Sequence, residues 1–246
     1  MNGLVTVVTA VHAAGAEYLP DAYASLVKQQ LPHGWDWQWV IQEDGRTGTV
    51  AGYLPYDSRI DFSDGRHGGP GVARTMALAR AEGSLVKVLD ADDMLTPDAL
   101  ARDIAVLTER ADTGWATSRA LDLLPDGSTV GFDQDPPEGP IERGALLHRW
   151  EALDHVPPVV PGSLCIRREL LLALGGWMAL PASEDTGLLL AASAVSQGYF
   201  TAKTGLLYRK WPGQSTRQPA HADPAEREAR IRIIRARAEA LGFASA

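Results

Sequence analysis

The segment SLVKVLDADDMLTP, residues 84–97, carries the strongest strand pattern of this 246-residue chain. Residues 85–89 form an apolar run interrupted by a single lysine, and three carboxylates follow it directly: Asp90, Asp92 and Asp93. A strand without polar alternation is expected where helices cover both faces of a parallel sheet. In open α/β sheets, ligands bind beyond the carboxyl ends of the strands. The segment therefore predicts a buried strand whose end carries part of a binding site.

The cluster of carboxylates at this strand end is electrostatically unfavourable unless another group offsets the repulsion. If the backbone stays extended, Asp90 and Asp92 point to the same side. Two ionised carboxylates about 5 Å apart repel by roughly 3 kcal/mol at an effective dielectric near 20. A divalent cation offsets this repulsion, and Mg²⁺ or Mn²⁺ prefers carboxylate oxygens together with substrate phosphates. Alternatively, they are solvated loop residues before a helix, whose dipole also favours negative charge.

Strand and helix patterns alternate through the first hundred residues and become mixed afterwards. Predicted strands span residues 4–9, 37–42, 59–62, 85–90, 115–123, 128–132, 163–166, 200–203 and 206–211. Predicted helices span residues 20–30, 71–81, from a cap at 96–98 to 108, 183–196 with Ser183 as cap, and 224–241, and loops span 133–140 and 212–223. Strands separated by helices imply right-handed crossovers and a parallel sheet. We therefore expect an α/β fold whose open sheet is mostly parallel and resembles a nucleotide-binding sheet.

Composition argues against several classes of protein. The net charge of −8 does not favour nucleic-acid binding, which would need a basic patch. The single cysteine, Cys165, excludes an internal disulfide framework and a cysteine-rich zinc site. No apolar run approaches the ~20 residues that span a bilayer, and no basic region precedes the first strand as in a signal peptide. We expect a cytoplasmic protein without a transmembrane segment.

Several short motifs accompany the carboxylates in a characteristic order. They are VTVVTA (residues 5–10), WVIQEDG (39–45), GGPGVART (68–75), the Asp-x-Asp at 90–92, and SEDT (183–186) preceded by LGGW (174–177). Each motif is weak alone, since a glycine-rich helix start or an Asp-Gly turn is common. Together they resemble the family 2 glycosyltransferases of the GT-A fold, in which a Rossmann-like sheet binds a nucleotide sugar and a mixed second half binds the acceptor.

The resemblance implies a donor site for a nucleotide sugar, with UDP or dTDP as the expected carrier. The implied donor-binding residues are Thr9, Ala10, Asp44, Arg74, Asp90, Ala91, Asp92, Arg209 and Lys210. Among them, Asp44 corresponds to the carboxylate that accepts the pyrimidine N3–H, although an Asp-Gly turn explains it equally well. Asp92 and Asp90 correspond to the ligands of Mg²⁺ or Mn²⁺. Thr75 stands where the family has an asparagine after the arginine.

The resemblance also implies how the sugar is transferred. Asp185 matches the catalytic base, which would activate an acceptor hydroxyl. A base that acts from the face opposite the leaving group implies a single displacement with inversion. Glu184, Trp177 and Trp211 are expected on the acceptor side, and Trp150, His148 and His155 are candidate pocket walls. The alternative for Glu184 and Asp185 is helix capping, because acidic residues stabilise a first turn.

The segment Tyr208-Arg209-Lys210-Trp211 departs from the family pattern of Tyr-Arg-x-His. In many members that histidine contacts the metal or the diphosphate, whereas an indole nitrogen is only a donor and cannot ligate a metal. Arg209 and Lys210 would then neutralise diphosphate charge. Trp211 would alternatively stack on a sugar or a base, and His221 is a candidate replacement ligand.

The resemblance implies one GT-A domain over residues 1–246, in which 1–110 bind the nucleotide sugar, 111–223 bind the acceptor and 224–246 form a C-terminal helix. The expected activity is metal-dependent transfer of a hexose or pentose to a small-molecule, glycan or lipid-linked acceptor. The alternatives are a non-catalytic sugar-nucleotide-binding protein and a sugar-1-phosphate nucleotidyltransferase. The apolar spacing of the C-terminal helix predicts packing on the body, and its arginines suggest instead a homodimer contact or a peripheral membrane surface.

Overall fold

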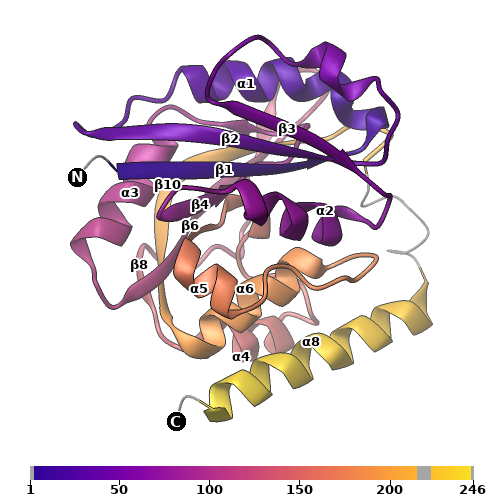
Figure 1. Ribbon diagram of the computed structural model, residues 1–246. Helices are drawn as coiled ribbons and strands as arrows, with labels where there is room; N and C mark the ends of the chain where they lie inside the picture. The colour runs from indigo at the N-terminus through magenta and orange to yellow at the C-terminus, as the bar shows by residue number, and fades with distance from the viewer. Residues whose placement is uncertain (1–2, 215–222, 245–246) are drawn as a thin grey trace.

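The computed structural model describes residues 3–214 and 223–244, which form a mixed β-sheet flanked by helices (Figure 1). The strands are β1 (Gly3–Val11), β2 (Trp35–Asp44), β3 (Ile60–Gly65), β4 (Leu85–Val88), β5 (Met94–Leu95), β6 (Thr113–Leu123), β7 (Thr129–Val130), β8 (Gly139–Ile141), β9 (Cys165–Arg167) and β10 (Gln197–Arg209). The α-helices are α1 (Leu19–Val27), α2 (Pro70–Ala77), α3 (Ala99–Glu109), α4 (Ala145–Ala152), α5 (Arg168–Ala173), α6 (Glu184–Val195) and α8 (Pro224–Ala244), and short 3-10 helices span Ala13–Tyr18, Val50–Tyr53, Leu78–Arg80 and Pro161–Ser163. The predicted α/β class is confirmed.

The sheet has the strand order β3-β2-β1-β4-β9-β6-β10-β5. The first four strands pair in parallel, with Val5–Val8 of β1 in register with Leu85–Val88 of β4. β9 pairs antiparallel with both β4 and β6, and β10 runs parallel to β6. One continuous sheet therefore joins a parallel first half to a mixed second half.

Two hydrophobic cores lie on the opposite faces of the sheet. One contains Leu19 and Leu26 of α1 together with Leu100 and Ile104 of α3. The other contains residues of α2, α4, α6 and α8, and α8 packs along α6 at the base of the view in Figure 1. No helix within the described ranges combines the length and apolar character that crossing a bilayer requires. The predicted packing of the C-terminal helix on the body is confirmed.

Lys87, the polar residue within the apolar run, is fully buried in β4. Its Nζ donates to Asp103 Oδ2 at 2.7 Å and to the Ser163 carbonyl at 2.6 Å. A buried ammonium is tolerated only when it is paired and hydrogen-bonded. The pair ties α3 and the segment before β9 to the strand whose end carries the aspartates.

Several predicted boundaries were wrong, for local reasons. The strands expected at 200–203 and 206–211 form the single strand β10, because the polar residues between them lie at a bulge near Thr204 rather than in a turn. The expected loop at 133–140 ends in β8, and the short helices α4 and α5 were not predicted. Asp98 and Ser183 precede helices in the left-handed conformation, with φ of 60° and 63°, and neither side chain makes the capping hydrogen bond that an extended cap residue makes.

Candidate functional site

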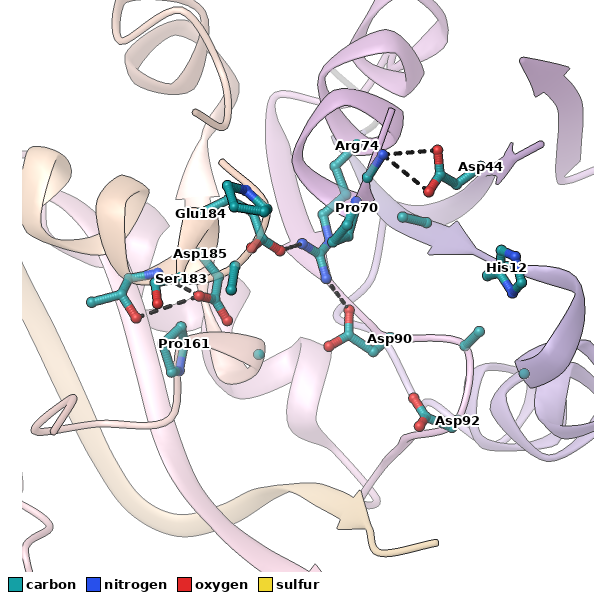
Figure 2. A pocket seen from close by; sticks show the side chains of 18 of the residues that line it. His12, Asp44, Pro70, Arg74, Asp90, Asp92, Pro161, Ser183, Glu184 and Asp185 are labelled. Atoms are coloured by element: carbon teal, nitrogen blue, oxygen red, sulfur yellow. Dashed lines mark hydrogen bonds and ion pairs between the residues drawn. The ribbon is translucent and has the colours of Figure 1, made fainter. Parts of the chain in front are cut away.

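A cavity of about 830 Å³ opens where β1, β2 and β4 end (Figure 2). The first half of the chain contributes Ala10, Val11, His12, Ala14, Gly15, Asp44, residues 67–70, Arg74, Asp90, Ala91 and Asp92. The second half contributes Trp150, His155, Pro157, residues 160–162, residues 181–186, Tyr208, Trp211 and Gly213, and α8 contributes Arg227, Arg230, Ile231 and Ile234. The carboxyl ends of the parallel strands therefore face helices from the rest of the chain, as expected for a ligand site in an open α/β sheet.

Arg74 of α2 joins the two halves of the cavity. Its Nη2 donates to Asp90 Oδ1 at 2.5 Å and its Nη1 donates to Glu184 Oε1 at 2.6 Å (Figure 2). The guanidinium is buried, which disfavours its charge, but the Asp90, Glu184 and Asp185 carboxylates outweigh this and raise the pKa of Arg74. Arg74 is thus a permanent cation that positions the strand-end carboxylate beside the start of α6.

Asp185 lies next to Glu184 in the first turn of α6 and lines the cavity. Its Oδ1 accepts a hydrogen bond from the Thr186 N–H at 2.6 Å. Burial and the neighbouring Glu184 charge raise the pKa of Asp185 to about 7, although Arg74 opposes them. A carboxylate whose pKa lies near neutrality is suited to accept a proton from a hydroxyl group.

Asp92 is held by Trp211, which stands where the resemblance in sequence implies a histidine. Trp211 Nε1 donates to Asp92 Oδ2 at 2.6 Å, and the indole packs on the Tyr18 ring with centroids 5.0 Å apart. Burial raises the pKa of Asp92, the Trp211 hydrogen bond lowers it, and the Asp90 charge raises it further. Trp211 therefore orients a strand-end carboxylate instead of supplying a ligand atom.

Asp93 and Arg209 fix the loop after β4. Asp93 is fully buried and accepts the Arg209 N–H at 2.9 Å, and burial together with the Asp92 and Asp90 charges raises its pKa well above the usual range. Arg209 also donates to the Asp92 carbonyl at 2.8 Å and to Asp21 Oδ2 at 2.7 Å. Arg209 thus ties β10 to the strand-end loop and does not itself line the cavity.

Asp44, at the end of β2, shapes the glycine segment before α2. Its Oδ1 accepts the Gly68 N–H at 2.7 Å and the Gly69 N–H at 3.1 Å, and its Oδ2 lies 2.9 Å from His67 Nδ1. Gly69 has a φ of 89°, a conformation that favours glycine. Asp44 is buried and lines the cavity. It therefore holds the backbone of Gly68 and Gly69 in place and also forms part of the cavity wall.

Three other residues with expected site roles lie outside the cavity lining. The Thr9 side chain is buried, and its hydroxyl donates to the Leu89 carbonyl and accepts from the Trp39 indole. Lys210 pairs with Asp122 at 3.1 Å, and Trp177 is buried in the core beside Thr75. His221 lies outside the described residues.

Of the candidate pocket walls, Trp150 and His155 line the cavity, whereas His148 is exposed and does not. Analysis of the sequence did not identify His12, His67, Arg227 and Arg230 as lining residues. The two histidines are adjacent to recognised motifs, which was an available signal. The arginines of α8 had no such signal, because their spacing along a helix does not say which of them faces the site.

An alanine at Gly71 should destabilise the contact between α2 and the start of α6. A Cβ there would overlap the Met178 carbonyl oxygen and lie 3.0 Å from Glu184 Cβ. We expect the free energy of unfolding to fall by about 1–3 kcal/mol in urea titrations, the usual cost of overpacking. Gly52→Ala is the matched control, because no heavy atom lies within 4 Å of its added Cβ. Equal losses in the two variants would contradict this close packing.

The carboxylates at the strand end provide oxygen atoms of the kind that Mg²⁺ and Mn²⁺ prefer. Asp90 and Asp92 line the same cavity, and each has one oxygen engaged by a neighbouring N–H group. Within residues 3–214 and 223–244, no group of three or more histidine, cysteine, aspartate or glutamate side chains is arranged to hold a metal ion. A divalent ion bound by these two aspartates would have to take its other ligands from water or a bound phosphate.

Comparison with known proteins shows which family and which relative this chain resembles in sequence. Residues 6–120 match the model of glycosyl transferase family 2. TuaG of Bacillus subtilis (strain 168), assigned to teichuronic acid biosynthesis as a glycosyltransferase, is 32% identical over 133 residues, which are 52% of this chain and 50% of TuaG. The chain thus spans about half the length of this curated relative.

Solved structures of S. aureus TarS (residues 1–349) have a similar fold. The complex with UDP-GlcNAc superimposes with a TM-score of 0.66 at 18% identity, covering 88% of this chain and 61% of the 1–349 chain of TarS. The complex with UDP gives a TM-score of 0.64 at 19% identity, covering 85% and 61%. Residues 6–120 are thus similar in sequence to glycosyltransferase family 2, and most of the chain has the GT-A fold of the TarS structures.

Proposed function

We propose that this chain transfers a sugar from a nucleoside diphosphate, UDP in the first instance, to an acceptor hydroxyl with inversion. The observation that carries the proposal is the bridge of Arg74 between Asp90 and Glu184, which sets the strand-end carboxylates and Asp185 around one cavity. The complexes of TarS with UDP and UDP-GlcNAc support a uridine nucleotide as the donor carrier. In this proposal residues 1–110 bind the donor, 111–223 bind the acceptor and α8 completes the wall.

In the proposed reaction, the Asp185 carboxylate accepts the proton of the acceptor hydroxyl as its oxygen bonds to the anomeric carbon and the bond from that carbon to the diphosphate breaks. Asp92 and Asp90 would hold a divalent ion, which would supply stabilisation of the negative charge on the departing diphosphate. Trp211 keeps Asp92 oriented, and Arg74 keeps Asp90 and Glu184 in place. In this proposal Asp44 and the Gly68–Gly69 backbone, which line the cavity, contact the base and ribose of the donor. Asp185 acts opposite the leaving diphosphate, which gives inversion.

The proposal is tested by thermal unfolding with UDP in the presence and absence of Mn²⁺, followed by a screen for transfer from UDP-sugars. Ligand at about 100 times its dissociation constant should stabilise the fold by about 2.7 kcal/mol. UDP binding without transfer or hydrolysis would favour a non-catalytic binding protein. Release of pyrophosphate would favour a nucleotidyltransferase.

Asp92→Ala should remove most of the Mn²⁺-dependent part of UDP binding. The variant leaves Asp90 as the remaining proposed ligand, and Asp90 Oδ1 is already engaged by Arg74. We expect the dissociation constant of UDP with Mn²⁺ to rise at least tenfold, which is about 1.4 kcal/mol, as measured by calorimetry. Asp112→Ala, at an exposed carboxylate before β6, is the control and should bind normally. Unchanged Mn²⁺ dependence in Asp92→Ala would refute the metal assignment.

A further inference from the structure

Arg230 of α8 is a buried cation that the donor chemistry does not use. It is 5% exposed and lines the cavity, yet within the described residues its Nε and Nη1 atoms have no hydrogen-bond partner. Its ion-pair partner is Glu226, whose carboxylate lies 3.7 Å away and is half exposed. A buried guanidinium with unmade hydrogen bonds is costly unless a ligand completes them.

The other cavity-lining arginines are already engaged. Arg74 is matched by two carboxylates at 2.5 and 2.6 Å, and Arg227 donates to the Asp154 carbonyl at 3.0 Å. The lining of the same cavity includes another donor without a partner: Trp150 is 2% exposed, and its Nε1 has no hydrogen-bond partner among the described residues. The second half of the chain and α8 thus each contribute a buried N–H donor to the cavity, whereas the strand ends contribute carboxylates.

We propose that Arg230 binds an anionic group, a phosphate or a carboxylate, on the acceptor. This rests on the glycosyltransferase function proposed above, and it assigns the acceptor a chemical class. The strand-end aspartates and the glycine segment before α2 form the proposed donor side, while α8 also lines the cavity and packs on α6, which carries Asp185. Arginine suits both oxyanions, because its planar guanidinium matches their geometry and keeps its charge when buried.

The test fills the donor site first and then measures anion binding. Protein saturated with UDP and Mn²⁺ is titrated calorimetrically with glycerol 3-phosphate and with glucuronate, and with glycerol and glucose as their neutral counterparts. We expect at least one anion to bind at least tenfold more tightly than its neutral counterpart. Arg230→Gln should remove that preference and Arg230→Lys should restore part of it. Arg232→Gln is the matched control, since Arg232 lies on the same helix with its side chain 71% exposed.

The outcomes separate this inference from the proposed function. Preference for glycerol 3-phosphate alone assigns a phosphate-bearing acceptor, and preference for glucuronate alone assigns a carboxylate-bearing one. Normal UDP binding without anion preference, or equal loss in Arg230→Gln and Arg232→Gln, overturns the inference and leaves the proposed function standing. Absence of UDP binding, with an anion preference that depends on Arg230, refutes the donor assignment and supports the anion site. Circular dichroism melts of all variants show that each is folded during the titration.

Discussion

Asp185→Asn is expected to lower the rate of sugar transfer by about 10²–10⁴-fold, the usual contribution of a general base. Asparagine keeps the size of the side chain but cannot accept the proton of the acceptor hydroxyl. Binding of UDP with Mn²⁺ should remain within about threefold of the parent, because Asp185 lies on α6 rather than at the strand ends that hold the donor in our proposal. Steady-state transfer assays and calorimetry measure the two effects separately.

The raised pKa of Asp185 gives this prediction a pH dependence. Since the carboxyl titrates near pH 7 in the folded chain, kcat/KM should rise as the pH increases through about 7 and level off above it. Stability should change in the opposite direction. The folded chain retains a proton that the unfolded chain releases near pH 4, so the contribution of Asp185 to stability falls between about pH 4 and pH 7.

Asp185→Asn should therefore melt at a higher temperature than the parent at pH 8 and at the same temperature below about pH 4. Glu169→Gln is the matched control, because Glu169 is an exposed acidic residue in the first turn of α5 and should alter neither transfer nor the pH profile. Near-full turnover of Asp185→Asn would show that another group is the base.

Arg74→Met is expected to cause the largest loss of stability. The substitution leaves the Asp90 and Glu184 carboxylates without the guanidinium that they share, and breaking a buried pair in this way costs about 3–5 kcal/mol. For a chain of this length, the melting temperature should fall by about 10 °C. UDP binding should weaken as well, since Asp90 loses its position beside Asp92.

The control for Arg74 is Arg46→Met, which removes a surface pair with Asp64 at 3.5 Å in which both side chains are more than half exposed. Such pairs contribute little to stability. A double-mutant cycle of Arg74→Met with Glu184→Gln should show clear non-additivity, because the two residues share one ion pair. Additive effects, or a loss no larger than in Arg46→Met, would contradict the bridging role of Arg74.

The parallel half of the fold could be predicted because its signals are local. The apolar run of β4 and the glycine segment before α2 each predict the element formed by those same residues, and the motif order indicated the family whose model residues 6–120 match. Predictions from local sequence were wrong where contacts between distant segments determine the backbone conformation. β10 continues through a bulge because it pairs with β6 on both sides of it, and the left-handed conformation of Ser183 is not encoded by its preference for helix caps.

The amino-acid pattern is enough to show that carboxylates follow a buried strand and that an acidic pair opens a later helix. The partners of these carboxylates depend on the folded chain, because they are distant in sequence: Arg74 reaches Glu184 across 110 residues, and Trp211 reaches Asp92 across 119. The raised pKa of Asp185 depends on its burial beside Glu184, and Arg230 is buried on α8, which packs against α6. Desolvation and charge pairing are properties of the assembled cavity, so no single segment carries them.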